Sequence, residues 1–322
     1  MVTPSRARPT LAPGKARASV SSSMSVVVEL SAVIVAFHAG RPQVLTVERD
    51  GRAALPSGAF DPSMDRTLDR AMRRWGQELT GVRLGFAEQL YTFGDIDRDA
   101  AAAKLGERRL SIAYLAFVPD SSASHRDAEA AEWHDIYELL PWEDRRAGSE
   151  SAGGNAIRSA IDLFCSNGAD EAESARRLER ADMCWSTAGA PWDPVRSLER
   201  YELLFEAGFL AEAGGVPMAL DHRRVLASAL GRMRGKLTYR PVVFELLPAA
   251  FTLSALQQVV EALIGVALHK QNFRRLVENA RLVEGTGVRS ANTGGRPAEL
   301  FHFRREVLRE RSASGMNLPG RR

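Results

Sequence analysis

Apolar residues recur in two different patterns along the first half of the chain. Runs of β-branched and other apolar residues predict strands at residues 26–37 (VVVELSAVIVAF), 43–48, 88–93 and 110–118. Between the second and third of these runs, residues 68–79 place apolar side chains at spacings of three and four, which predicts a helix that ends at Gly81. The alternation of strands and helix predicts an α+β domain that closes near Trp142.

The middle of the chain has a weaker pattern. Residues 145–195 begin with a Gly- and Ser-rich stretch and continue with short helical segments of mixed charge, which predicts a linker with accessory helices. Residues 200–214 predict an amphipathic helix whose stripe includes Phe205. Residues 222–237 predict another helix, with apolar side chains on one face and arginines on the other. We expect these two helices to join the halves of the chain and to be candidates for a dimer interface.

The last quarter of the chain predicts a helix, a tight turn, a second helix and a two-stranded hairpin, which is the order of a winged helix-turn-helix. The first helix has Thr252 as its expected N-cap and ends at Gly265. Its apolar residues repeat at three and four, at Leu253, Leu256, Val260 and Leu263.

The second of these helices carries the candidate DNA-binding residues. Phe273, Leu276 and Val277 form its buried side, whereas its start and exposed side carry Lys270, Gln271, Asn272, Arg274 and Arg275. Arginine pairs with guanine, asparagine and glutamine pair with adenine, and surplus positive charge binds phosphate. Arg296, which follows two glycines at the hairpin end, is placed to enter a minor groove. A charge run is usually only a solvated face, but these residues coincide with one exposed helix face, which favours DNA binding.

Charge is distributed unevenly, and this supports the same interpretation. The whole chain has a formal net charge of +3, from 43 Lys and Arg against 40 Asp and Glu. Residues 222–322 contain 18 Lys and Arg against 7 Glu, a net charge of +11, so the preceding residues carry −8. A basic end on an acidic body is typical of nucleic-acid binding, although it would equally suit an acidic membrane or protein partner.

Further features of the sequence favour a cytoplasmic protein that does not enter a membrane. No apolar run approaches the roughly 20 residues that span a bilayer, and the first residues lack the apolar core of a signal peptide. The 2 cysteines, Cys165 and Cys184, have no cluster of His or Cys beside them, so they indicate neither a metal site nor a disulfide. Residues 1–25 are basic and rich in Ser and Pro, which predicts a disordered tail.

Residues 55–82 resemble the Nudix box, the motif whose helix holds the magnesium ions that activate water on a diphosphate in Nudix hydrolases. Arg74, Glu78, Gly81 and Val82 match the motif. The other carboxylate positions hold Arg66, Trp75 and Leu79, and the loop after Gly58 is longer by two residues. With one carboxylate left of four, we expect neither a metal site nor catalytic residues.

A degenerate Nudix box combined with a winged-helix end is similar to the Nudix-related transcriptional regulators of NAD metabolism, the NrtR type, and most similar to the alphaproteobacterial branch called NadQ. The resemblance extends over most of the chain from Val28 to about Arg311, and residues 269–278 (HKQNFRRLVE) are among its most specific segments. It implies a homodimeric repressor that binds a palindromic operator ahead of genes for NAD synthesis and responds to a nucleotide effector. That effector is expected to be ADP-ribose, NAD or ATP, and a pathway intermediate is a further candidate for the NadQ branch.

The resemblance also implies where the effector would bind. Arg49, Arg74, Glu78 and Tyr91 lie on or beside the elements where Nudix proteins hold the diphosphate and base. The chain has no Rossmann glycine fingerprint, so the nucleotide would sit in the Nudix fold. Two structural alternatives stay open: Arg74 and Glu78 as an ion pair on the helix surface, and Tyr91 as a core residue.

The expected fold is therefore α+β, with an N-terminal Nudix-like α/β/α sandwich joined by helices to a C-terminal winged helix-turn-helix. The expected division is a tail (1–25), a sensor domain (26–145), a linker with accessory helices (146–220), the DNA-binding domain (221–311) and a second tail (312–322). Two rival functions stay open. One is a divergent Nudix hydrolase, acting on ADP-ribose or another nucleoside diphosphate derivative, that recruits Asp61, Asp65, Asp95 or Asp97. The other is a DNA-binding protein without a ligand, in which the Nudix fold serves only for dimerisation.

Overall fold

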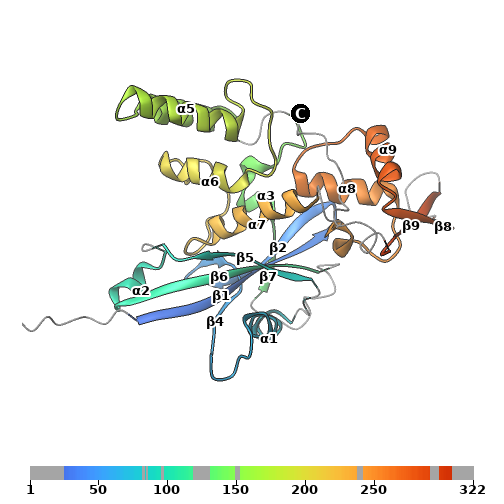
Figure 1. Ribbon diagram of the computed structural model, residues 1–322, viewed down its shortest axis with the longest axis horizontal. Coiled ribbons are helices and arrows are strands. Elements are labelled where there is room, and N and C mark those ends of the chain that lie inside the picture. The colour runs from blue at the N-terminus through green and yellow to red at the C-terminus, as the bar shows by residue number, and fades with distance from the viewer. Residues whose placement is uncertain are drawn as a thin grey trace, which may run out of the picture.

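A mixed β-sheet forms the centre of the N-terminal half (Figure 1). The computed structural model describes residues 25–81, 84, 86–95, 98–118, 131–148, 153–237, 242–290 and 297–306. Its seven N-terminal strands are β1 (Ser25–His38), β2 (Arg41–Arg49), β3 (Arg52–Ala54), β4 (Ser57–Ala59), β5 (Ala87–Phe93), β6 (Glu107–Phe117) and β7 (Ala131–Asp135). They follow the order β3-β2-β1-β6-β5, with β4 paired to β1 and β7 paired to β2. β1 runs parallel to β6 and antiparallel to β2, so the predicted hairpin is confirmed.

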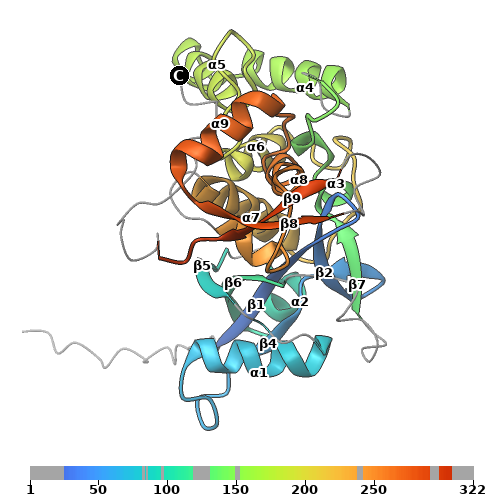
Figure 2. The same ribbon diagram turned by 90° about the vertical axis from the view of Figure 1, so that its right-hand side faces the viewer.

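Helices cover both faces of this sheet, which confirms the predicted α/β/α sandwich. Alternate residues of β1 point to opposite faces, because side chains alternate along a strand. Leu30 and Ile34 pack with Met72 of α1 (Leu68–Thr80) on one face. Val33 and Val35 belong to a second core on the other face, where α3 (Ile136–Leu139) and α7 (His222–Leu237) lie. Figure 2 shows α1 beneath the sheet and α3 and α7 above it.

The middle of the chain adds further helical layers above α7. These are α4 (Gly154–Ser166), α5 (Glu171–Trp185) and α6 (Ser197–Glu206), preceded along the chain by α2 (Ala100–Lys104) and the short 3-10 turn η1 (Pro141–Glu143). α6 packs on α7, and the pair α4 and α5 packs on α6 (Figure 2). Cys165 and Cys184 are both free and buried in these layers. No described helix is both long and apolar enough to cross a membrane.

Two predictions for this region are wrong. The helix expected at residues 200–214 ends at Glu206, because Gly208 takes a left-handed conformation with φ of 69° and its N–H caps the Phe205 carbonyl. Phe205, expected on the apolar stripe, is 63% exposed. The arginines of α7 were predicted on the face opposite its apolar residues, and two of them, Arg223 and Arg234, are buried because carbonyl groups from distant segments accept their hydrogen bonds.

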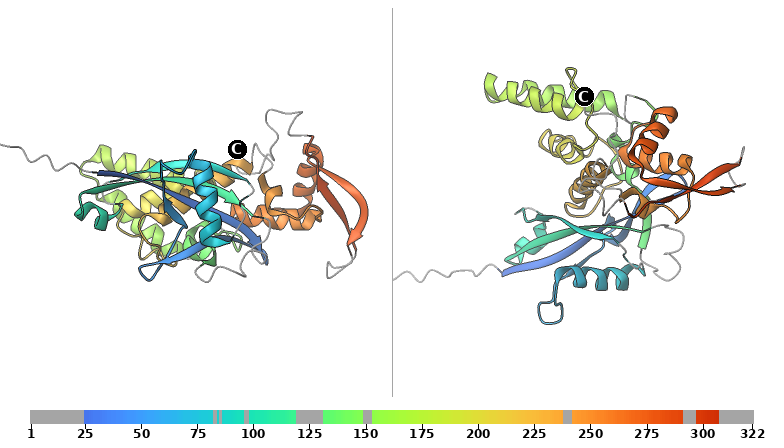
Figure 3. Two further views of the ribbon diagram at one scale, coloured as in Figure 1. Left: turned by 90° about the horizontal axis from the view of Figure 1, so that it is seen from below. Right: turned by 45° about the vertical axis from the view of Figure 1, so that its right-hand side comes forward.

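The C-terminal elements follow the predicted order and lie at one end of the sheet (Figure 3). After the 3-10 turn η2 (Val242–Leu246) come α8 (Leu253–Ile264), α9 (Lys270–Ala280), β8 (Val283–Ser290) and β9 (Ala298–Phe303). One continuous hydrophobic cluster runs from Val33 of the sheet through Leu230 of α7 to Val260 of α8 and Val277 of α9. The N-terminal sheet and the C-terminal helices α8 and α9 therefore share one core rather than being joined by a free linker.

Candidate nucleic-acid interface and effector region

Side chains of α8 fix the turn between the two helices of the helix-turn-helix. Thr252 caps the start of α8 by accepting a hydrogen bond from the Ala255 N–H, as predicted. The Glu261 carboxylate accepts from the Leu268 N–H over 2.7 Å and from Gln257 Nε2 over 2.9 Å. Gln257 Nε2 also donates to the Leu268 carbonyl over 2.9 Å. These contacts satisfy both backbone groups of Leu268 and so hold the start of α9 at a defined angle to α8.

The exposed face of α9 is available to a ligand. Phe273 and Val277 are buried as predicted, while Leu276 is half-buried. All five predicted DNA-binding residues of this helix are exposed: Lys270, Gln271, Asn272, Arg274 and Arg275. None of the five makes an ion pair or a side-chain hydrogen bond with another described residue. Their charges and amide groups are therefore not engaged elsewhere in the part of the chain that the structure describes.

The hairpin beside α9 is anchored by aromatic residues. The backbone of Phe251 exchanges two hydrogen bonds with Phe301 of β9, of 2.9 and 2.8 Å. Phe244 stacks on Phe303 with ring centroids 4.3 Å apart. Arg296, predicted at the hairpin end, lies outside the described residues. The hairpin strands β8 and β9 extend from this anchor beyond the helices (Figure 3).

Two basic residues near α9 were missed in the sequence. Arg281 follows the helix with a left-handed φ of 49°, and Arg289 lies on β8; both are exposed. Both arginines follow the basic helix in the sequence and could have been included on that ground. The sequence does not show which side of the hairpin a β8 residue occupies, because that depends on the register of the two strands. Arg281 and Arg289 add exposed positive charge at the end of α9 and on the hairpin.

The Nudix-box helix keeps the shape of the motif. Thr67 caps the start of α1 and Gly81, with φ of 68°, ends it. Arg74 donates to the Asp65 carboxylate over 2.8 Å and lies 3.4 Å from Glu78. The hydrogen bond that Arg74 donates to Asp65 raises the pKa of Arg74. The alternative that Arg74 and Glu78 form an ion pair on the helix surface therefore agrees with the geometry.

The described carboxylates among those named for a substitute metal site are engaged by other groups of the protein. Asp65 accepts from Arg74 and from the Asp61 N–H, and Asp61 accepts from Ser63. Asp95 pairs with Arg224 of α7, and Asp97 lies outside the described residues. In the described part of the chain, no three or more His, Cys, Asp and Glu side chains are grouped as metal ligands would be.

Arg49 belongs to a polar cluster that lies between the sheet and the start of α7. Asp99 lies 3.6 Å from Arg49 and 3.7 Å from Arg109, measured between the charged groups. In the same cluster Arg98 lies 2.7 Å from Asp221, the residue before α7. This cluster could not be predicted from the sequence, because its members come from segments that are distant along the chain.

His222, the first residue of α7, is fully buried in this cluster. Its Nδ1 accepts a hydrogen bond of 3.0 Å from the Leu55 N–H, so the ring is neutral with its proton on Nε2. Burial lowers the pKa of His222 to about 3, with help from the positive charges of Arg98 and Arg49. The Nε2 of His222 has no hydrogen-bond partner among the described residues, and the terminal nitrogens of Arg98, although ion-paired with Asp221, form no well-aligned hydrogen bond there. The cluster thus contains buried polar groups whose hydrogen-bonding capacity is unused.

Tyr91 is separate from this cluster. It is 63% exposed on β5, with its ring 6.4 Å from that of Phe93, so the alternative of a core position is wrong. Among the four predicted effector residues, the structure pairs only Arg74 with Glu78, and it places Arg49 with Asp99 instead.

Comparison with known proteins identifies the C-terminal domain and finds a relative of part of the chain. Residues 243–303 match the NrtR DNA-binding winged helix domain. Over 94 residues the chain is 36% identical to the ADPR responsive transcriptional repressor of Acinetobacter baylyi, a match that covers 29% of this chain and 37% of that relative. The chain thus matches little more than a third of that relative's length.

Solved structures extend the likeness in fold to nearly the whole chain. Shewanella oneidensis NrtR, crystallised with a 27mer DNA, aligns with a TM-score of 0.58 at 22% identity, over 92% of this chain and 99% of that one. A MutT/nudix family protein from Enterococcus faecalis aligns with a TM-score of 0.52 at 16% identity, over 87% and 88%. The predicted order of a Nudix-like domain followed by a winged helix domain is confirmed.

Proposed function

We propose that this chain, which carries the winged helix domain of the NrtR type, is a transcriptional repressor that binds operator DNA and is controlled by a nucleotide. The observation that carries the proposal is the exposed face of α9, where Lys270, Arg274 and Arg275 have no ionic partner among the described residues. In a helix-turn-helix this second helix enters the major groove with its first turns against the base edges. Arg274, Gln271 and Asn272 supply base-reading groups there, while the remaining charge binds phosphate.

ADP-ribose is the first candidate for the effector, because the Acinetobacter relative is named as ADPR responsive. NAD and ATP are the other two candidates. Arg49 is the residue best placed to meet a diphosphate, since its side chain is 30% exposed and borders the buried cluster in which His222 Nε2 has no hydrogen-bond partner among the described residues. A cavity of about 150 Å³ beside this cluster is lined by residues that include Asp99, Arg108 and Arg109. Small-molecule pockets usually have roughly 300 Å³ or more, so a whole nucleotide would enter only if α2 or its flanking loop moves.

The Nudix-like domain acts as a sensor without catalysis in this proposal. Support comes from the sequence of the Nudix box, which keeps Glu78 but has Arg66, Trp75 and Leu79 at the other carboxylate positions. Magnesium requires several oxygen ligands and charge compensation, and one exposed glutamate paired with Arg74 offers little of either. The homodimer, the regulation of NAD-synthesis genes and the place in the NadQ branch belong to the proposal as well.

The proposal is tested by fluorescence anisotropy of the full chain on duplexes from promoters of NAD-synthesis genes and on a scrambled duplex, at fixed salt. Salt must be fixed because phosphate contacts make affinity strongly salt-dependent. We expect selective binding, a shift of affinity with ADP-ribose, NAD or ATP, and a dimer in light scattering. Equal binding to promoter and scrambled DNA would refute the operator assignment.

A second measurement separates the sensor from an enzyme. The protein is incubated with magnesium and ADP-ribose, and AMP release is followed by chromatography beside an active Nudix hydrolase. We expect no turnover. Sustained turnover that is abolished by a chelator would replace the sensor with the divergent hydrolase.

A further inference from the structure

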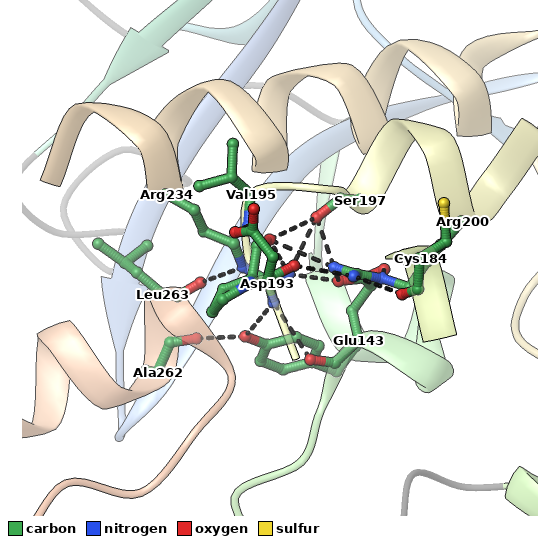
Figure 4. A network of polar contacts seen from close by, with 11 residues as sticks. Glu143, Cys184, Asp193, Val195, Ser197, Arg200, Arg234, Ala262 and Leu263 are labelled. Carbon is green, nitrogen blue, oxygen red and sulfur yellow. Dashed lines mark hydrogen bonds and ion pairs between the residues drawn. The ribbon is translucent and has the colours of Figure 1, made fainter. Parts of the chain in front are cut away.

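A buried ionic network joins the N-terminal domain to the helix-turn-helix (Figure 4). Glu143 of η1 is fully buried between Arg200 of α6 and Arg234 of α7, and both arginines have fully buried side chains. Arg200 donates to Glu143 through Nε over 2.6 Å and through Nη2 over 2.9 Å. Burial alone would raise the pKa of Glu143, but the two arginines lower it to about 2, so the carboxylate is charged.

The same network reaches the end of α8. Arg234 Nε donates to the Leu263 carbonyl over 2.9 Å, and the Tyr137 hydroxyl donates to the Ala262 carbonyl over 2.5 Å. These carbonyls belong to the last turn of α8, where a helix has no internal donors left for its carbonyl groups. A side chain of α3 and a side chain of α7 therefore cap the first helix of the helix-turn-helix. A cation at this position is also favoured by the helix dipole.

The residue that ends α8 fits closely into this junction. Gly265 has a left-handed φ of 71°, and a Cβ there would overlap the Glu143 carbonyl and lie 2.8 Å from Arg234 Nη2. Its carbonyl accepts a hydrogen bond of 2.7 Å from the Arg145 N–H. The turn that leads into α9 is thus held by residues 137–145 through side chains and backbone together.

The other end of α7 lies in the polar cluster beside Arg49. Asp221 and His222 contact Arg98 and the Leu55 N–H there, while Arg234 contacts α8 three turns later. Sixteen helical residues span roughly 24 Å. A single rigid element therefore touches both the region that the proposed effector would enter and the helix that orients α9.

Stability alone does not account for a network of this kind. Taking a carboxylate and two guanidinium groups out of water is costly, and apolar residues of similar volume often give equal or greater stability. What a buried network supplies in addition is a fixed geometry, because each donor has one satisfactory arrangement.

We propose that Tyr137, Glu143 and Arg234 are positioning residues for DNA binding, through which the N-terminal domain sets the placement of α9. The inference rests on the proposed function. None of the three needs to touch DNA or effector; they act through the end of α8. When the effector disturbs the start of α7, the displacement reaches Arg234 and changes the capping of Ala262 and Leu263.

The test uses Tyr137→Phe in the full chain, because this variant removes one hydroxyl and leaves the buried charges paired. Tyr201→Phe is the matched control, since Tyr201 is 6% exposed on α6 and makes no hydrogen bond to α8. Two quantities are measured: amide hydrogen exchange over residues 262–270, and the ratio of operator affinities with and without saturating ADP-ribose. The operator is a duplex selected by the wild-type protein from a random library.

We expect exchange over residues 262–270 to accelerate in Tyr137→Phe by about two- to tenfold, the effect of losing one hydrogen bond. In the same variant, the ratio of operator affinities with and without ADP-ribose should move towards one by a similar factor. Titration calorimetry should show that Tyr137→Phe binds ADP-ribose as the wild type does. Tyr201→Phe should match the wild type in both quantities. Unchanged exchange together with an unchanged ratio would overturn the inference.

Failure of the proposed function would give a different result. If the wild type does not distinguish operator from random DNA, or does not respond to ADP-ribose, that function or that effector is wrong. The exchange rates are then read separately: acceleration confined to residues 262–270 in Tyr137→Phe supports the placement of the end of α8 by Tyr137, and its absence refutes that placement.

Discussion

The backbone N–H of Arg145 donates a hydrogen bond of 2.7 Å to the carbonyl of Gly265, the residue that ends the first helix of the helix-turn-helix. This contact joins the last segment of the Nudix-like domain directly to the turn before α9. Gly265 can approach so closely because it has no side chain and because φ of 71° carries no penalty for glycine.

Gly265→Ala should therefore destabilise the protein more than its backbone conformation alone explains. Gly51→Ala is the matched control, since Gly51 has φ of +72° and nothing within 4 Å of an added Cβ. We expect Gly51→Ala to cost about 1 kcal/mol of unfolding free energy, and Gly265→Ala to cost about 1–3 kcal/mol more, as overpacking does. Thermal and urea unfolding of both variants measure the difference. Equal losses of unfolding free energy would mean that the residues around Gly265 accommodate the added methyl group at no cost.

Arg274→Ala should weaken operator binding by about 1–3 kcal/mol if the guanidinium reads a base, and should weaken random DNA much less. Arg176→Ala is the control, because Arg176 is an exposed arginine of α5, far along the chain from α9, with a side chain that is 67% exposed. Anisotropy titrations on operator and scrambled duplexes give both affinities. Parallel losses on the two duplexes would make Arg274 a phosphate contact and remove it from the base-reading set.

How far the sequence predicts this structure depends on whether a signal is local. Helix α8 begins after Thr252 and ends at Gly265, and α1 ends at Gly81, as predicted, because caps act within one turn. The exposed face of α9 was equally predictable from its spacing.

Signals that depend on distant partners were not predictable. The sequence places Arg234 on the arginine face of a helix but does not show its burial, because its partners are Glu143 and the Leu263 carbonyl, 91 and 29 residues away. The same holds for the cluster of Arg49, Asp99 and His222, which exists only because the start of α7 folds back onto the sheet. A periodic pattern shows which face of a helix is apolar, but not which polar residue finds a buried partner.

Stability should fall between pH 6.5 and 5 because of His222. Its pKa is lowered to about 3 in the folded protein from an ordinary 6.5, so the unfolded chain binds the proton first as the pH falls. The stability contributed by the neutral ring is full above pH 6.5 and is lost progressively down to pH 3. From pH 7 to pH 5 the loss is about 2 kcal/mol. Urea unfolding at a series of pH values measures it.

His222→Asn tests the origin of that loss, because asparagine does not titrate and its Oδ1 can still accept from the Leu55 N–H. We expect the pH dependence between 5 and 7 to flatten in this variant, whereas His302→Asn, at an exposed position of β9, should leave it unchanged. Glu143 does not interfere in this range, since its lowered pKa of about 2 confines its contribution to the window below the ordinary value of 4.5. A slope that survives His222→Asn would assign the effect to other groups.

Arg49 should be required for the stabilisation of the protein by its nucleotide effector. A ligand that binds only the folded state adds about 2.7 kcal/mol at 100 times its dissociation constant, so thermal unfolding with ADP-ribose, NAD and ATP should identify the effector by a raised midpoint. Arg49→Ala removes the guanidinium beside Asp99 and should reduce that shift strongly. Arg52→Ala is the control, because Arg52 is exposed and lies directly opposite Arg49 on the neighbouring strand β3.

The two variants separate a pocket from a general effect of charge. Both remove one arginine from the same edge of the sheet, so a nonspecific attraction of the nucleotide would weaken equally in each. A shift lost in Arg49→Ala and kept in Arg52→Ala places the effector at the buried cluster, on the face of the sheet that α7 covers. Equal shifts in both variants would move the site elsewhere on the domain, and the exposed pair of Arg74 and Glu78 on α1 would be the next position to test.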